Sequence, residues 1–306
     1  MSQLRFDERV AIVTGAGRGL GRAYALLLGS RGAKVVVNDT GASLKGGGID
    51  GQPAEEVARE IRAAGGQGIS STESVATADG ARAIVAAAMD RYGRIDILIH
   101  NAGIVRGAPL KEMTQEDFDA VIDVHLRGGF RIVSQAFPIM CRSGYGRIVM
   151  TASVNGLYGN HRQANYAAAK GGLIGLSHVV ALEGAAEGVK CNVILPGAVT
   201  RMAEGLDTSA YPTMPPELVA PVVGWLAHEV CSVTGEILIS MAGRVARAFV
   251  GESRGVYRPE WSIEGVAEQM AALRSIDAPL VFPVVPSGQA DHIRHSFAMA
   301  RGGLTS

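Results

Sequence analysis

A strand-like run, Val10–Thr14 (VAIVT), leads directly into the glycine-rich sequence TGAGRGLG at residues 14–21. Its glycines fit the spacing GxxxGxG, whereas Leu20 rules out GxGxxG. Such glycines allow a sharp turn and a close approach to a pyrophosphate, whose charge is favoured at a helix N-terminus. A glycine-rich loop alone indicates only a tight turn, but its place between strand and helix favours a nucleotide site. The predicted cofactor contacts here are Gly15, Arg18, Gly19, Leu20 and Gly21.

The rest of the chain repeats this alternation of strand and helix. Short apolar runs predict strands at Val10–Thr14, Lys34–Asn38, Gly68–Ser71, Ile95–His100, Arg147–Thr151, Lys190–Leu195 and Glu236–Ser240. Longer patterns between them predict helices at Leu20–Ser30, Pro53–Ala64, Ala78–Tyr92, Gln115–Cys141, Asn165–Glu187 and Pro216–Glu229. Strands that are apolar throughout are typical of parallel sheets covered on both faces. We therefore predict an α/β fold, a Rossmann-like doubly wound parallel sheet of about seven strands with ligands at the strands' carboxyl ends.

Two stretches depart from the alternation. Thr40–Gln52 is a glycine-rich insertion after the second predicted strand. From about Val245 the rhythm stops, and one further helix is predicted from the spacing of Ile263, Val266, Met270 and Leu273. We expect a nucleotide-binding domain over residues 1–245 and a C-terminal extension over 246–306. The extension is a lid, a subunit-contact arm or, more simply, a packing appendage.

Composition excludes several classes of protein. Of 306 residues, 47% are hydrophobic and 19% charged, which indicates a globular core rather than disorder. Lys+Arg and Asp+Glu both number 29, so the total charge gives no reason to expect nucleic-acid binding. Three cysteines without CxxC spacing favour a reducing compartment. We expect a cytoplasmic protein, because there is no apolar run of 18 residues, no signal-like start and no peroxisomal address at the C-terminus.

Asp39 ends the second predicted strand, 24 residues beyond Gly15. A carboxylate at this place accepts hydrogen bonds from the adenosine ribose hydroxyls and repels a 2′-phosphate. It therefore favours NAD over NADP. Two observations stand against this preference: Arg18 could meet a 2′-phosphate, and Asp39 could merely cap a loop.

Tyr166 and Lys170 are four residues apart in a helical segment, so they share one face. Ser153 lies 13 residues before Tyr166. A free tyrosine has a pKa near 10, and a neighbouring ammonium with an oxidised nicotinamide would lower it by about two or three units. Ser153 would then hydrogen-bond the substrate oxygen while a hydride moves to the nicotinamide. The alternative is a core tyrosine beside a surface lysine.

Several separated motifs carry a family resemblance. TGAGRGLG, Asn101-Ala102-Gly103, Ser153, YAAAK ending at Lys170, and Pro196-Gly197 resemble, in this order, the short-chain dehydrogenase/reductase family over about residues 6–245. The resemblance implies a one-domain oxidoreductase with Tyr166 as acid/base, Lys170 on the nicotinamide ribose and Ser153 orienting the carbonyl. It also implies cofactor contacts by Glu73, Ser74, Val75, Asn101, Ala102, Gly103, Pro196, Gly197, Val199 and Thr200.

Two histidines depart from the family pattern. His100 replaces the usual Asn before Asn-Ala-Gly, which we interpret as a packing change. His125 stands where the family has an Asn that completes a proton relay. We expect His125 to support catalysis through its main-chain carbonyl or through a side chain that titrates near neutrality. The competing interpretation is a buried histidine with all its hydrogen bonds satisfied.

A narrower resemblance bears on the substrate. VVVNDTG followed by LKGGG, VHLRGGF, and GLYGNHRQANYAAAKGGLIGL resemble the dehydrogenase unit of peroxisomal multifunctional enzymes, also described as a hydroxysteroid dehydrogenase. This implies a free-standing dehydrogenase that oxidises a (3R)-hydroxyacyl-CoA or a hydroxysteroid with NAD. Apolar walls are predicted at Leu157, Tyr158 and the loop Met202–Met214. Candidate phosphate contacts, each also explicable as solvated surface, are Arg106, Arg162, Arg201 and Arg244.

Other functions and assemblies are open at this point. One alternative is an NADPH-dependent 3-oxoacyl-carrier-protein reductase, which Asp39 disfavours. Another is a non-catalytic nucleotide-binding sensor or scaffold, which the intact Ser153, Tyr166 and Lys170 disfavour. Small residues along Asn165–Glu187 and the family resemblance predict a homodimer or homotetramer. His292 and His295 beside Asp291 lack a third strong ligand, so no metal is predicted.

Overall fold

The computed structural model describes residues 3–48, 50–200 and 211–302. Its strands are β1 (Val10–Thr14), β2 (Lys34–Asn38), β3 (Gln67–Ser71), β4 (Ile97–His100), β5 (Gly146–Thr151), β6 (Val189–Gly197), β7 (Ile237–Met241) and β8 (Arg244–Ala248). They form one sheet in the order β3-β2-β1-β4-β5-β6-β7-β8, and the pairs from β3 through β7 are parallel. The chain order reverses between β1 and β4, which places a ligand crevice at the carboxyl ends of these strands.

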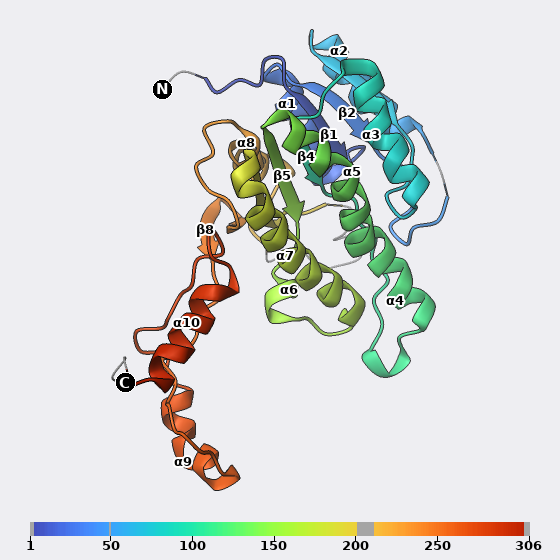
Figure 1. Ribbon diagram of the computed structural model, residues 1–306. Coiled ribbons are helices and arrows are strands. Elements are labelled where there is room, and N and C mark those ends of the chain that lie inside the picture. Colours follow the sequence, from blue (N-terminus) through green and yellow to red (C-terminus); the bar gives the residue numbers. More distant parts are fainter. Residues whose placement is uncertain (1–2, 49, 201–210, 303–306) are drawn as a thin grey trace. The chain divides into compact units, whose positions relative to one another are not determined.

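Helices cover both faces of this sheet. Within Met1–Arg247 the helices are α1 (Gly19–Ser30), α2 (Gln52–Ala63), α3 (Ala78–Tyr92), α4 (Gln115–Ile122), α5 (Gly128–Ser143), α6 (Asn155–Tyr158), α7 (Ala164–Gly184) and α8 (Ala220–Ala227). Two more, α9 (Ile263–Leu273) and α10 (Gln289–Ala300), follow in the C-terminal part of the chain. Short 3₁₀ turns lie at Leu110–Glu112, Ala185–Glu187 and Pro216–Leu218. Helix α1 packs against α2 and α8, and α3 packs against α5. Figure 1 shows α5 and α7 in front of strand β5.

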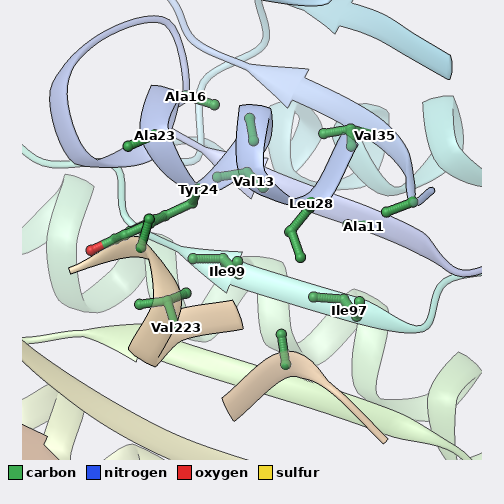
Figure 2. Close-up of a cluster of buried hydrophobic side chains, with 14 of the residues drawn as sticks. Ala11, Val13, Ala16, Ala23, Tyr24, Leu28, Val35, Ile97, Ile99 and Val223 are labelled. Carbon is green, nitrogen blue, oxygen red and sulfur yellow. The ribbon is translucent and has the colours of Figure 1, made fainter. Parts of the chain in front are cut away.

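Burial on both sides explains the composition of the strands. Every residue of β1 and of β4 is buried. Figure 2 shows one side of the sheet, where Val13 and Ile99 lie with Leu28 of α1 and Val223 of α8 in one hydrophobic cluster. Removing each such side chain from water contributes about 1.5–3 kcal/mol to folding. The apolar runs therefore fix the middle of the sheet, and with it the position of the crevice.

The predicted doubly wound α/β sheet is confirmed, and the structure adds two features to it. The first is an eighth strand, β8, whose two arginines suit an edge strand and whose sequence lacks an apolar run. The second is a π-helical turn at Asp123–Arg127, which interrupts the predicted helix Gln115–Cys141. A π turn inserts an extra residue into a helix and is frequent at functional sites. Helical periodicity in the sequence does not distinguish it from a regular turn.

The chain divides into two compact units, Met1–Arg247 and Ala248–Ser306. In the second unit, the predicted helix is α9, which begins after Ser262; the Ser262 hydroxyl accepts a hydrogen bond from the Gly265 N–H at 3.0 Å. A second helix, α10, carries His292 and His295, and both rings contact the ring of Phe282. In neither unit does a described helix have the length and apolar character needed to span a membrane.

Candidate active site

A cavity of about 470 Å³ lies at the carboxyl ends of the central strands. Most of the predicted site residues line it, although they come from separate parts of the chain. The insertion after β2 and the loop after β4 form part of its wall. The predicted residues that it brings together are Gly15, Arg18, Gly19, Leu20, Asp39, Glu73, Ser74, Val75, Asn101, Ala102, Gly103, Arg106, His125, Ser153, Tyr166, Lys170, Pro196 and Thr200.

Other predicted residues do not belong to the described lining of this cavity. Gly21 and Gly197 are packed against protein atoms instead, because an added Cβ would lie 2.1 Å from the Gly15 carbonyl oxygen and 2.4 Å from Met241 Cγ. Tyr158 is 79% exposed. The remaining ones are Val199, Leu157, Arg162 and Arg244. Arg201 and most of the loop Met202–Met214 lie outside the described residues.

The glycine-rich loop has the backbone that a pyrophosphate site requires. Gly15 and Gly19 have φ values of 64° and 54°, a region that side chains disfavour. Helix α1 begins at Gly19, so the N–H groups of its first turn face the loop. Gly21 lets this helix approach the turn closely. These residues fit a dinucleotide cofactor, whose phosphates would lie at the positive end of α1.

Asp39 organises the same region. Its Oδ2 accepts a hydrogen bond from the Gly17 N–H at 2.8 Å, and its Oδ1 accepts one from the Gly41 N–H at 2.7 Å. The carboxylate therefore ties the cofactor loop to the insertion, as the capping alternative expected. An ionised carboxylate has about four acceptor sites, so two remain for ribose hydroxyls. The two interpretations of Asp39 are compatible.

The insertion is a part of the site that the sequence argument missed. It contributes Thr40, Ala42, Ser43, Leu44 and Gly46 to the cavity wall. The Leu44 carbonyl accepts a hydrogen bond from the Val105 N–H at 2.9 Å, which fixes the insertion to the loop after β4. The signal was present in the sequence, because a glycine-rich segment that follows Asp39 directly has to begin beside the nucleotide.

Arg106 fastens this contact and is itself held in place. Its Nε donates to the Lys45 carbonyl at 2.8 Å, and its guanidinium lies 3.3 Å from an oxygen of Asp117 in α4. The main-chain carbonyl of Arg106 accepts from Asn165 Nδ2 at 2.8 Å. The second Asn165 Nδ2 hydrogen bond goes to the Asp117 carbonyl at 3.0 Å, and its Oδ1 accepts from the Tyr166 N–H. Buried Asn165 thus clamps the start of α7 to the cavity wall, a role that sequence analysis did not identify.

Tyr166 and Lys170 project from α7 toward the end of β5. The Ser153 hydroxyl lines the same cavity as the Tyr166 hydroxyl and is near enough to oppose the rise of the Tyr166 pKa. The Lys170 Nζ lies 5.4 Å from the centre of the Tyr166 ring and donates to the Thr151 carbonyl at 2.6 Å. Lys170 is buried rather than a surface lysine. The geometry can therefore place a substrate oxygen between two hydroxyls, with an amine nearby.

The electrostatics of the chain differ from the predicted ones. Burial raises the pKa of the Tyr166 phenol above 10, and the nearby Ser153 hydroxyl only partly opposes this. Burial also lowers the pKa of Lys170 to about 7. The predicted lowering of the tyrosine pKa is therefore reversed in the polypeptide itself. A cationic nicotinamide would have to supply the charge that favours the phenolate.

His125 lies in the π turn and is fully buried. Its ring meets the Tyr166 ring edge to face, with centroids 5.2 Å apart. Its Nε2 lies 3.0 Å from the Ile104 main-chain nitrogen and 2.9 Å from the Ile104 carbonyl oxygen, whereas Nδ1 has no partner among the described residues. Burial and the Lys170 charge hold the pKa of His125 well below 6.5. The expectation that His125 titrates near neutrality was wrong, because desolvation keeps the ring uncharged.

Comparisons with known proteins agree with this arrangement. A model of the short chain dehydrogenase family matches residues 9–209, more than half of the chain. The chain is 48% identical over 259 residues to the peroxisomal multifunctional enzyme type 2 of Drosophila melanogaster, covering 84% of this chain and 43% of that protein. It is 44% identical over 241 residues to the peroxisomal hydratase-dehydrogenase-epimerase of Saccharomyces cerevisiae, covering 78% and 27%. The chain thus spans less than half of the length of either relative.

Solved structures of related dehydrogenases have the same fold as this chain. The full-length Drosophila multifunctional enzyme superposes with a TM-score of 0.80 at 38% identity, covering 99% of this chain and 51% of that one. A short chain dehydrogenase from Mycobacterium avium superposes with a TM-score of 0.77 at 36% identity, covering 90% of this chain and 98% of that one. The second comparison covers the relative almost completely.

Proposed function

Because the chain belongs to the short-chain dehydrogenase family, we propose that it oxidises a secondary alcohol to a ketone with Tyr166 as the acid/base group. The observation that carries this is that Ser153, Tyr166 and buried Lys170 line one cavity, with the Lys170 Nζ 5.4 Å from the centre of the Tyr166 ring. These groups line the same cavity as the glycine-rich loop. The chain is an oxidoreductase of the short-chain alcohol dehydrogenase type.

Tyr166, Ser153 and the cofactor have separate roles in the proposed oxidation. NAD, held by the glycine-rich loop and Asp39, would supply the acceptor for the hydride of the alcohol carbon. The Tyr166 oxygen takes the hydroxyl proton, and the Ser153 hydroxyl donates a hydrogen bond to the substrate oxygen. Since oxidation needs an ionised Tyr166 whose pKa burial raises, kcat for oxidation rises with pH and kcat for ketone reduction falls.

Substitution of Tyr166 tests this division. Tyr166→Phe is expected to lower kcat by at least about hundredfold, since it removes the acid/base group. NAD binding should persist, and it can be measured by the quenching of intrinsic fluorescence. Tyr158→Phe is the matched control, because Tyr158 is 79% exposed and outside the described lining of the cavity. Retained turnover in Tyr166→Phe would reject the assignment.

We propose NAD as the preferred cofactor. Asp39 lines the cavity with acceptor sites to spare, and its charge would repel a 2′-phosphate. Exposed Arg18 also lines the cavity and favours the second candidate, an NADPH-dependent 3-oxoacyl-carrier-protein reductase. Comparing kcat/KM with NAD and NADP, in the native chain and in Asp39→Asn, decides between them. NADP preference in the native chain would overturn the proposal.

For the substrate we propose a (3R)-hydroxyacyl-CoA or a hydroxysteroid. The sequence similarity to a peroxisomal multifunctional enzyme and to a hydratase-dehydrogenase-epimerase supports this class. A panel of hydroxyacyl-CoA esters of several lengths, a steroid-CoA ester, a free hydroxysteroid and an acyl-carrier ketone, each with both cofactors, tests it. Highest kcat/KM for the acyl-carrier ketone with NADPH would select the reductase instead.

Assembly and location complete the proposal. A homodimer or homotetramer built partly on α7 is supported by Val179, which is 50% exposed, and by open space around Gly175. Light scattering of the purified chain measures this directly. A cytoplasmic location stays a prediction, since the two named relatives are peroxisomal, and cell fractionation distinguishes the two compartments.

A further inference from the structure

His100, which the sequence suggested was a packing change, makes a hydrogen bond with each of its ring nitrogens. Its Nδ1 lies 3.3 Å from the Thr14 hydroxyl at the end of β1. Its Nε2 lies 2.9 Å from the main-chain carbonyl oxygen of His125 in the π turn. The side chain is 1% exposed. His100 therefore connects the strand that leads into the cofactor loop with the turn that carries the His125 ring.

The partners of Thr14 fix the protonation of this ring. The Thr14 hydroxyl accepts hydrogen bonds from the N–H groups of Asn101 at 3.0 Å and Ala102 at 3.1 Å. A hydroxyl has two acceptor sites and one proton, so its proton goes to Nδ1 of His100. Nε2 then carries the ring proton and donates it to the His125 carbonyl, which can only accept. Burial lowers the pKa of His100 to about 4, so the neutral ring persists at physiological pH.

Two glycines make room for the rings. A Cβ added to Gly129 would lie 3.1 Å from Cδ2 of His100, and one added to Gly103 would lie 2.3 Å from Cε1 of His125. In the π turn the Gly128 N–H reaches both the Asp123 and the His125 carbonyls, so the His125 carbonyl, which has two acceptor sites, is bound by this N–H and by the His100 ring. The absence of a side chain at Gly129 thus leaves the space that the His100 ring occupies.

We propose that His100 is a positioning residue of the proposed reaction: it holds the His125 carbonyl, and through the π turn it holds the His125 ring against Tyr166. The proposal rests on the function proposed above. His100 touches neither substrate nor cofactor and acts on Tyr166 only through His125. Its loss would remove a donor from the His125 carbonyl in the π turn, whereas the Thr14 hydroxyl would still accept hydrogen bonds from the Asn101 and Ala102 N–H groups.

Two substitutions separate the hydrogen bond from packing. The amide of His100→Gln ends near the position of Nε2 and can still donate to the His125 carbonyl, whereas that of His100→Asn reaches only the position of Nδ1. We expect His100→Asn to lower kcat by about ten- to hundredfold, as misplacement of an acid/base group does. His100→Gln should keep kcat within about threefold, and KM for NAD and alcohol should change less than about twofold in both variants. His178→Gln, on α7, is the control.

Equal losses of kcat in the Asn and Gln variants, or losses that follow the melting temperature, would show that His100 only packs. Long-range ¹H–¹⁵N spectra of the native chain give a readout independent of activity, and they serve even where the Asn variant does not fold. We expect the Nε2–H tautomer for His100, and the Nδ1–H tautomer would overturn the hydrogen-bond assignment. A chain with the expected tautomer that oxidises no alcohol in the panel would instead reject the proposed function.

Discussion

At the scale of single residues, buried Lys170 carries a charge at the expense of stability. Its pKa is about 7, below the ordinary lysine value of 10.5, because burial disfavours the ammonium. Between these two pH values the unfolded chain binds a proton that the folded chain lacks, so the free energy of unfolding rises with pH. Below pH 7 both states are protonated, and the full desolvation penalty remains. A group kept at such a penalty is typical of functional sites.

Lys170→Met should therefore stabilise the protein while it impairs turnover. We expect a gain of roughly 1–3 kcal/mol at pH 6, after allowing for the Thr151 carbonyl left without its donor. The gain should shrink toward pH 10, where the native lysine is neutral in the folded state. Urea unfolding at the two pH values measures this gain in stability. Lys190→Met is the control, because the ammonium of Lys190 also donates to a main-chain carbonyl, that of Cys231. A gain that is independent of pH would contradict the desolvation argument.

The candidate site was predictable as far as local spacing determined it. Tyr166 and Lys170 share a helix face, and the glycine loop follows a strand, so both groups could be placed from sequence. The hydrogen bonds of His100 and Asn165 join residues 25 to 86 positions apart, and no local pattern encodes such pairs. The predicted lowering of the Tyr166 pKa was wrong for a related reason, because the direction of the shift depends on how deeply the phenol is buried.

At the scale of elements, the insertion Thr40–Gln52 contacts the loop after β4 through a side-chain hydrogen bond and a main-chain hydrogen bond of that loop. Arg106 provides the first and Val105 the second. The Arg106 guanidinium binds the Lys45 carbonyl and Asp117, which leaves it fewer donors for the predicted contact with a CoA phosphate. The insertion forms part of the wall beside Asp39. Loosening it should act first on the cofactor.

Arg106→Ala is accordingly expected to raise the Kd for NAD by about five- to thirtyfold, equivalent to roughly 1–2 kcal/mol for the lost hydrogen bonds. Its effect on KM for an acyl-CoA should be smaller. Calorimetry with NAD and steady-state kinetics measure the two quantities. Arg162→Ala, at an exposed position outside the described lining, serves as the comparison. A selective rise in the acyl-CoA KM would return Arg106 to the role of a phosphate contact.

At the scale of the whole molecule, the sheet followed from the sequence because the central strands are mostly apolar and are covered on both faces. The reversal of chain order between β1 and β4 then fixed the edge at which the cavity opens. The edge strand β8 and helix α10 did not follow, since neither contributes a long apolar pattern. Prediction from periodicity thus fails where burial is shallow.

The division into two units makes a last expectation testable. Every described residue that lines the cavity belongs to the unit Met1–Arg247. A chain ending at residue 250, which keeps β8 complete, should therefore bind NAD with a Kd within about twofold of the full chain, a difference below roughly 0.5 kcal/mol. Circular dichroism establishes that the shortened chain is folded, and calorimetry measures the Kd. A folded chain with a much weaker Kd would assign residues 251–306 a part in cofactor binding, which an independent nucleotide-binding unit does not need.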